Sequence, residues 1–274
     1  MAITTIRVLG KMKIVNLWKK NKEILWELAL NDFTTKYAGS SLGVFWAFIQ
    51  PAVTILVYWC VFEFGLKATP PVPNVTYIVW FATGMVPWFF FAEGINAVTN
   101  SLLEYSYLVK KVLFDVELLP LIKMLSAFFV HIVFCVLLVV VSYTTGNKPS
   151  LYSLQLFYYM TALMCLIYAI GKITSAIILF FKDLGQIVNI IIQIGVWATP
   201  IIWPYTIVPE KYRWIVKLNP MFYITEGYRD CFIKNKMFWE KPLLTTYFWC
   251  VSVFLLIVGN VVFSKLRPHF ADVI

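Results

Sequence analysis

Two ionisable side chains lie inside long apolar runs, where a charge is costly unless it faces a cavity or an opposite charge. Lys172 lies in the run AIGKITSAIILFF, ten residues before Lys182. On a helix this separation is about 15 Å, which places Lys172 near mid-membrane if Lys182 marks the membrane edge. Glu93, in another apolar run, is the acid nearest in depth. The pattern predicts a charged group in a transport path or, alternatively, a lysine that snorkels to the surface.

The residue types that most often build enzyme centres form no such pattern. The five cysteines show no C-x-x-C spacing, and the two histidines, His131 and His269, lie far apart, so neither a metal site nor a disulfide framework is indicated. His131 is expected to be a hydrogen-bonded core residue. The sequence has no G-x-x-x-x-G-K-[ST] loop and no G-x-S-x-G motif. We therefore expect no catalytic residue, metal or cofactor in this chain, and an energy source elsewhere.

The elements that must position the two charges are membrane helices. Of the 274 residues, 61% are hydrophobic and 14% charged, whereas soluble domains have about 25% charged residues. Apolar runs long enough to cross a bilayer occur at 45–66, 77–98, 121–143, 152–181, 186–203 and 244–263. They predict an all-α, multi-pass membrane protein with about six spans in a single domain, 1–274. Its parts are an N-terminal segment 1–44, spans one to five within 45–203, an outer segment 204–243 and span six at 244–263.

Basic residues near the span ends predict the orientation. Seven lysines and arginines precede the first span, and Lys110 and Lys111 lie between spans two and three. Both termini are therefore expected on the cytoplasmic side, without a cleaved signal peptide. The segment 204–243 holds seven basic residues although it should lie outside. Long segments cross largely regardless of charge, so its charge needs another explanation.

The segment before the first span predicts an amphipathic helix. Helical spacing gathers polar side chains of WKKNKEILWELALNDFTTKY on one narrow stripe, namely Lys20, Glu23, Glu27, Asn31 and Thr34. Lying flat at the headgroups, the helix would bury its apolar arc and present the stripe to the cytoplasm. It is either a passive anchor or a docking surface for a cytoplasmic partner. Acidic groups gain nothing from an anionic membrane, which favours docking.

The stretch KYAGSSLGVFWAFIQP, 36–51, joins this helix to the first span. Gly39 and Gly43 tolerate backbone angles that a steep turn requires, and Pro51 could kink or reset the span. We predict a hinge at these three residues. The alternative is that the glycines mark a close contact between two helices.

The outer segment contains two short amphipathic pieces, PEKYRWIVKL and MFYITEGYRDCFIK, separated by Asn219–Pro220, where a helix should end. Its basic residues predict a loose electrostatic guide for a polyanion at an exit, made of Lys211, Arg213, Lys217 and Arg229. The alternative is a solvated loop whose charges pair locally, as Glu226 with Arg229 or Asp230 with Lys234.

Aromatic residues also gather within spans. Tyr58, Trp59 and Phe62 share one face of the first span, and Trp197 lies in the fifth. Because sugars stack on aromatic rings, these residues and Lys172 are candidates for a substrate path. Helix packing is the alternative.

Taken in order, KYAGSSLGVFWAFIQP, VYWCVFEFGLK, TGMVPWFFF, LVKKVLFDVELLP, FFKDLGQIV and KLNPMFYITEGYRD resemble the permease subunits of ABC-2 type polysaccharide exporters. PSLYSLQLFYY and KLRPHFADVI, with two of these motifs, look most like wall teichoic acid export permeases. The resemblance covers nearly the whole chain. It implies a homodimer bound to two copies of a separate ATPase, which would carry ATP and Mg²⁺.

The resemblance also assigns positions. The helix at 20–37 would be the interface helix against the ATPase, with further contacts at Glu104, Tyr105, Lys110 and Lys111 and, in the turn Phe181 to Asp183, at Asp183. The outer segment would re-enter the membrane as a helical hairpin.

The function implied is export of an undecaprenyl-diphosphate-linked, anionic teichoic acid across the cytoplasmic membrane of a bacterium. O-antigen or capsular polysaccharide is the alternative cargo, and a drug or small-lipid exporter is a rival. A membrane polyprenyl-phosphate glycosyltransferase is a rival of another class, but it would need clustered acids for a metal. No nucleic-acid partner is expected.

Overall fold

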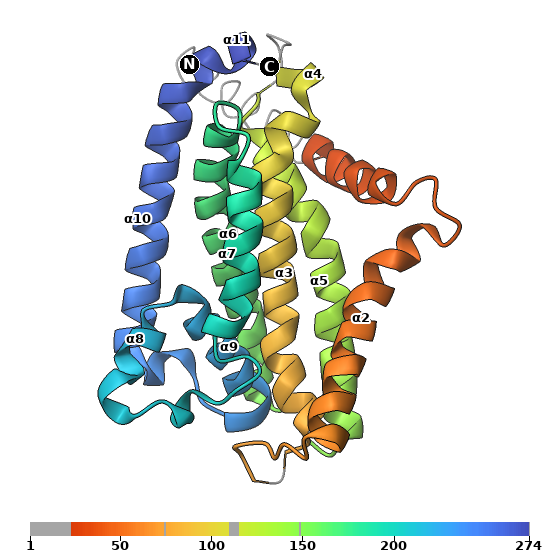
Figure 1. Cartoon of the computed structure of the whole chain (residues 1–274), viewed down its shortest axis with the longest axis vertical. Coiled ribbons are helices and arrows are strands. Elements are labelled where there is room, and N and C mark those ends of the chain that lie inside the picture. The colour runs from red at the N-terminus through yellow and green to blue at the C-terminus, as the bar shows by residue number, and fades with distance from the viewer. Residues whose placement is uncertain (1–22, 74, 110–114, 148, 274) are drawn as a thin grey trace, which may run out of the picture.

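The computed structural model describes residues 23–73, 75–109, 115–147 and 149–273, which form an all-helical bundle (Figure 1). A helix at 23–36 comes first. The long helices are α2 (Trp46–Trp59), α3 (Tyr77–Glu104), α5 (Leu118–Thr144), α6 (Leu156–Ile178), α7 (Leu184–Ala198) and α10 (Pro242–Leu266). Short helices are α4 (Ser106–Val109), α8 (Arg213–Lys217), α9 (Pro220–Arg229) and α11 (Phe270–Val273). The described residues contain no strand, which confirms the expected all-α class.

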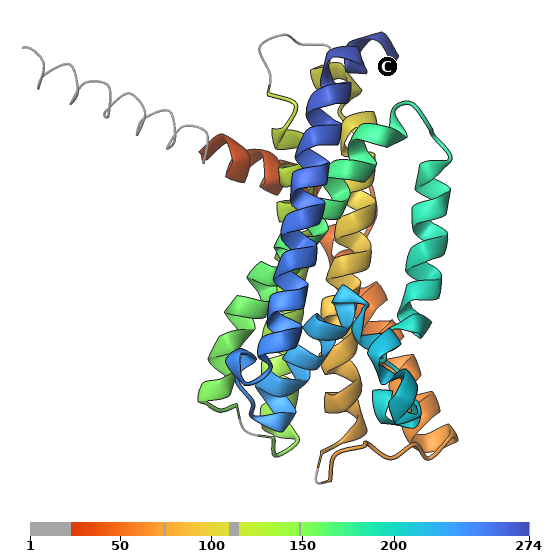
Figure 2. The same cartoon turned by 90° about the vertical axis from the view of Figure 1, so that its left-hand side faces the viewer.

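Among the described residues, five helical segments are long and apolar enough to cross a membrane: Gly43–Gly65, Tyr77–Glu104, Leu118–Thr144, Leu151–Ile178 and Pro242–His269. The remaining predicted span, 186–203, corresponds to α7, which has 15 residues. Such a helix is about 22 Å long, shorter than the roughly 30 Å hydrocarbon core. It nevertheless runs alongside the bundle (Figure 2), and the turn after it is buried at Thr199 to Ile202. The described residues thus hold five helical segments long enough to span and one shorter apolar helix beside them.

Helix α3 is the centre of the bundle and α2 stands at its edge. In the most apolar window of each, 72% of residues are buried for α3 and 6% for the α2 segment. Helix α3 packs against α5, α6 and α9, so its side chains are enclosed by protein on most sides. The loosely packed α2 presents much of its surface outward, as Figure 1 shows.

The two ends of the bundle differ in what they carry. We call the end that holds α4 and α11 the proximal end, and the opposite end, with α8 and α9, the distal end (Figure 1). The helix at 23–36 lies across the bundle toward the proximal end and is called here the lateral helix. It joins α2 through a turn and the single 3-10 turn Gly43–Phe45.

The distal segment, residues 199–241, is compact and partly inserted into the bundle. The expected break lies at Asn219–Pro220: Asn219 is the N-cap of α9, its side chain accepts a hydrogen bond from the Met221 amide, and proline occupies the first turn. Residues 221–232 are all buried. The prediction of two helical pieces is confirmed, and α9 is part of the core rather than a solvated loop.

Candidate functional site

The lateral helix presents the predicted polar stripe to solvent. Glu23, Glu27, Asn31 and Thr34 are all exposed, whereas Lys20 lies outside the described residues. The opposite face packs on the bundle, with Ala29 fully buried and the Trp26 ring edge-on to Phe129 of α5 at 5.0 Å. The helix therefore holds an acidic and polar surface away from the protein, available to a partner.

A buried carboxylate fixes this helix to the bundle. Asp32 is 6% exposed, and its Oδ1 lies 2.7 Å from the Lys123 ammonium of α5. The Tyr105 hydroxyl donates a hydrogen bond of 2.7 Å to the same oxygen, and Lys123 also pairs with Glu104. Burial and the bond to Asp32 raise the pKa of Tyr105, so the phenol stays protonated and can donate. We call these four residues the proximal latch.

Asp32 and Lys123 were not predicted from the sequence, although one signal was available. In a helix, Asp32 falls on the same face as Ala29 and Leu25, three and seven residues earlier, so it is a lone acid on the apolar face. Such a residue needs a buried partner of opposite charge. Lys123 is likewise a lone cation at the start of a long apolar run.

The other residues predicted to contact an ATPase are placed as follows. Glu104 keeps about half of its side chain exposed (52%) while it pairs with Lys123, and Tyr105 is half-buried in the latch. Asp183 is exposed in the turn between α6 and α7. Lys110 and Lys111 lie outside the described residues. The described members of the set lie near the proximal end, as a shared docking face requires.

Lys172 does not pair with Glu93, the acid that the sequence placed nearest to it in depth. Glu93 of α3 pairs instead with Lys36 at the end of the lateral helix. The Lys36 and Glu93 side chains are 43% and 45% exposed. Burial alone would lower the pKa of Lys36, but Glu93 raises it overall, so the ammonium remains charged.

Lys172 pairs with groups at the proximal end. Its ammonium lies 3.1 Å from Glu117 and 2.6 Å from Asn260 of α10, and Glu117 also binds Arg267 at 3.2 Å. Because α6 ends at Ile178, Lys172 is only about 9 Å from the helix end. The mid-membrane position predicted from Lys182 is thus too deep, and a structural ion pair accounts for this lysine.

The residues predicted to form a hinge adopt glycine geometry. Gly39 and Gly43 have φ of +92° and +52°, in the region where other residues are strained. A Cβ at either position would meet nothing within 4 Å, so neither glycine marks a close helix contact within the described part of this chain. Pro51 lies inside α2, which continues through it. Movement at the predicted hinge, Gly39, Gly43 and Pro51, stays a prediction.

The aromatic residues predicted for a substrate path divide between two settings. Tyr58 stacks with Phe62 at 6.2 Å, and Phe62 stacks on Tyr77 of α3 at 5.9 Å, so these rings join α2 to α3. The Trp59 indole donates to Glu63. Trp197 is 57% exposed on α7. Within this chain, helix packing explains Tyr58 and Phe62, and Trp197 is the ring that faces outward.

The basic residues of the distal segment do not act as one set. Lys211 and Lys217 are exposed, but Arg213 donates to the carbonyls of Val208 at 3.0 Å and Thr206 at 3.2 Å. Arg229 is 1% exposed, so its expected role as a loose surface guide is wrong. It points into the bundle because α9 is buried on all sides.

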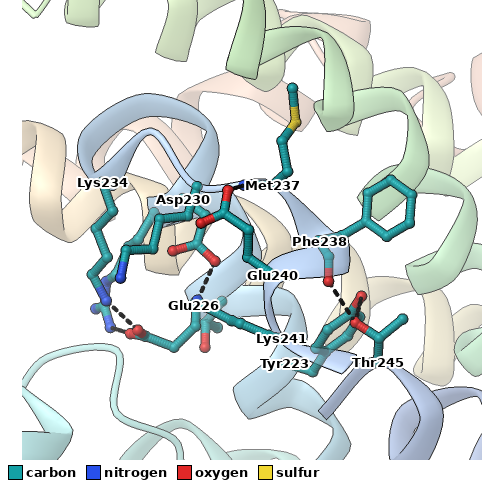
Figure 3. Close-up of polar contacts among 12 residues, drawn as sticks. Tyr223, Glu226, Asp230, Lys234, Met237, Phe238, Glu240, Lys241 and Thr245 are labelled. Atoms are coloured by element: carbon teal, nitrogen blue, oxygen red, sulfur yellow. Dashed lines mark hydrogen bonds and ion pairs between the residues drawn. The ribbon is translucent and has the colours of Figure 1, made fainter. Parts of the chain in front are cut away.

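Arg229 belongs to a buried charge cluster through its pair with Glu226, and Figure 3 shows Glu226 with Asp230, Lys234 and Lys241 of the same cluster. Its guanidinium binds Glu226 at 2.8 Å and donates to the carbonyls of Pro200 and Ile201 at 2.7 and 2.9 Å. Lys234 also pairs with Glu226, and Lys241 with Asp230. Burial alone would raise the pKa of Glu226, but Arg229 and Lys234 lower it to about 2. The local pairing of Glu226 with Arg229 is confirmed, while Asp230 pairs with Lys241 rather than Lys234.

Among the described residues, no group of three or more His, Cys, Asp and Glu side chains is placed to hold a metal ion. The buried His131 shares a 2.8 Å hydrogen bond with the Tyr228 hydroxyl, which confirms its expected role as a core residue.

Comparison with known proteins covers nearly the whole chain. The model of a family described as ABC-2 type transporter matches residues 24–233. The O-antigen export system permease protein RfbA of Klebsiella pneumoniae is 28% identical over 257 residues, which are 92% of this chain and 95% of that protein. A protein of the same name from Myxococcus xanthus is 26% identical over 95% of this chain and 99% of its own. The polysialic acid transport protein KpsM of Escherichia coli is 21% identical over 74% of this chain and 78% of that protein.

Proposed function

The chain belongs to the ABC-2 type transporter family, and from this premise we propose that it is the permease subunit of an ATP-driven exporter of a lipid-linked surface polysaccharide. The observation that carries the proposal is the end-to-end similarity to permeases named for O-antigen export, which extends over 92% and 95% of this chain. The acidic face of the lateral helix supports it as a surface that a cytoplasmic ATPase could use.

The relatives favour polysaccharide over the teichoic acid that the motifs suggested. Their names concern O-antigen and polysialic acid. The physical reason for an anionic polymer is also weaker, because Arg229 is buried and Arg213 is bound to backbone carbonyls. Exposed Lys211 and Lys217 still favour some attraction for a polyanion. Lipid-linked teichoic acid therefore remains the second candidate cargo.

In the proposed assembly the proximal end faces the cytoplasm of a bacterium, with both termini on that side. Two permease copies would bind two ATPase subunits, which supply ATP and Mg²⁺. The lateral helix would receive the motion of the ATPase. It would pass this motion to α2 through the predicted hinge, and to α3 and α5 through the proximal latch. Export would then follow a path between the two copies.

Transport by reconstituted vesicles tests this function and its cargo. Vesicles containing this chain and its ATPase should move a neutral, polyprenyl-diphosphate-linked polysaccharide only when ATP is hydrolysed. We expect Lys211→Gln with Lys217→Gln to leave the neutral cargo unaffected and to slow a polyglycerol-phosphate cargo by less than about twofold, because exposed charges are screened within about 8 Å. Transport of the anionic polymer alone would select teichoic acid, and transport of small hydrophobic drugs alone would refute the proposal.

A charge reversal on the lateral helix tests the docking face. Replacing Glu23 and Glu27 with lysine should leave the chain inserted, because both side chains are exposed, but should reduce recovery of the ATPase by about tenfold. The measurement is the ratio of ATPase to permease after purification through a tag on the permease. Glu210→Lys, an exposed acid of the distal segment, is the matched control. Unchanged ATPase recovery in the double variant would exclude this face.

A further inference from the structure

Two cavities lie against α3 and α5, the first beneath the end of the lateral helix and the second between these helices and α2. One has a volume of about 520 Å³ and the other about 440 Å³, both within the roughly 300–1,000 Å³ of small-molecule sites. They share lining residues: Lys36, Tyr37, Glu93, Asn96, Ala127 and Val130. The cavities therefore adjoin, and we treat them as two arms that meet at the Lys36–Glu93 pair.

The two arms have different chemistry. The larger, the polar arm, is lined by the amides Asn31, Asn96 and Asn100 and by the Thr35 and Tyr105 hydroxyls. The smaller, the apolar arm, is lined mainly by rings and aliphatic groups, among them Trp46, Pro51, Val86, Phe89 and Phe134. Along α3 the lining runs from Val86 in the apolar arm to Glu104 in the polar arm, a length of about 27 Å. Together they match an amphiphile with a chain and a head.

The charge at the junction also points to a polar occupant. Glu93 lies in a helix that crosses the membrane, and the Lys36 and Glu93 side chains are 43% and 45% exposed rather than packed away. A charged pair at such depth is stable where it faces a wet cavity or a polar ligand. Because its ammonium has three N–H donors, Lys36 could bind a phosphate and keep its contact with Glu93.

The charges of the polar arm limit the head group. Its wall carries two cations, Lys36 and Lys123, and three acids, so its formal charge is about −1. Anionic sugars in this arm would be repelled. Amides and hydroxyls both donate and accept hydrogen bonds, which suits the hydroxyl groups of neutral sugars.

We propose that the two arms bind the lipid-proximal end of the cargo: the apolar arm the start of the polyprenyl chain, Lys36 the linking phosphate, and the polar arm the first sugars. This inference rests on the proposed function and adds an entry site near the proximal end. The site lies beneath the lateral helix, so its occupation and the position of that helix are coupled.

Two bulky substitutions on α3 test ligand binding in the polar arm and in the apolar arm separately. Ala97 lines only the polar arm and Ala92 only the apolar arm. The probes are polyprenyl diphosphate carrying a neutral disaccharide and bare polyprenyl diphosphate, each titrated into the complete transporter in nanodiscs. Ala97→Trp should weaken binding of the disaccharide probe by about tenfold, equivalent to one or two lost hydrogen bonds, and leave the affinity for the bare probe unchanged. Ala92→Trp should weaken binding of both probes.

Controls distinguish the possible failures. Ala198→Trp, at an exposed position of α7 outside both arms, should bind both probes like the wild type. Ala97→Leu fills less volume and should fold where tryptophan does not, with an intermediate loss. Wild-type affinity in both bulky variants, or equal competition by phosphatidylglycerol, would overturn the inference. If the wild type bound the probes but exported no lipid-linked polysaccharide, the proposed function would fail instead.

Discussion

Replacing Arg229 with methionine is expected to lower the thermal unfolding midpoint of the purified chain by about 10 °C. The substitution leaves the 5% exposed Glu226 with Lys234 alone and removes the donors to the Pro200 and Ile201 carbonyls. Breaking a buried ion pair from one side costs about 3–5 kcal/mol, and for a protein of this size each kcal/mol moves the midpoint by about 2–4 °C. Size-exclusion chromatography after heating gives the midpoint in detergent.

The large effect follows from what Arg229 joins. Its guanidinium carbon lies 4.3 Å from the centre of the Trp80 ring of α3, while its nitrogens bind the turn that follows α7. One side chain on α9 thus connects the central helix α3 with the turn that follows α7. Because α7 is too short to span alone, this connection fixes where its distal end lies.

Two variants separate this effect from a general loss of positive charge. Arg213→Met removes an arginine that binds two carbonyls near the surface, and we expect its midpoint to fall by less than about 4 °C. Adding Glu226→Gln to Arg229→Met should recover part of the loss, because the buried carboxylate is no longer charged. A midpoint for Arg229→Met equal to that of Arg213→Met would contradict the proposed role of Arg229 in connecting α9 with α3 and the turn after α7.

Features that depend on neighbouring residues could be predicted from the sequence. The spans follow from apolar runs, and the break at Asn219–Pro220 follows from capping and proline geometry. Gly39 and Gly43 adopt positive φ angles, as expected for glycines in the steep turn predicted before the first span. Each of these signals lies within a few residues of its structural consequence.

Partners distant in the chain could not be predicted in the same way. The Lys36–Glu93 and Lys172–Glu117 contacts join residues 57 and 55 positions apart, and an apolar pattern does not specify which lysine meets which acid. Arg229 was misplaced for a related reason. Its segment reads as amphipathic and charged, and it is buried only because α3, α6 and α10 surround α9.

Lys123→Met is expected to reduce export by at least about tenfold while the complex still hydrolyses ATP. Lys123 is the cation of the proximal latch, and its loss leaves Asp32, which is 6% exposed, with only the Tyr105 hydroxyl. An unpaired buried carboxylate costs several kcal/mol, so the lateral helix should leave its seat on α5. The acidic stripe would still bind the ATPase, but its motion would no longer reach α3 and α5.

Hydrogen exchange and a second substitution show whether the latch transmits motion or only stabilises the chain. Amides of residues 23–36 should exchange faster in Lys123→Met, whereas those of α6 should not change. Lys265→Met, an exposed lysine near the same end, is the matched control and should export normally. Adding Asp32→Asn should restore the slow exchange, because a neutral amide tolerates burial beside the Tyr105 hydroxyl. If the double variant also regains export, seating the helix is sufficient for coupling. If exchange is unchanged in Lys123→Met while export falls, the latch is not what seats the helix, and this account of coupling is wrong.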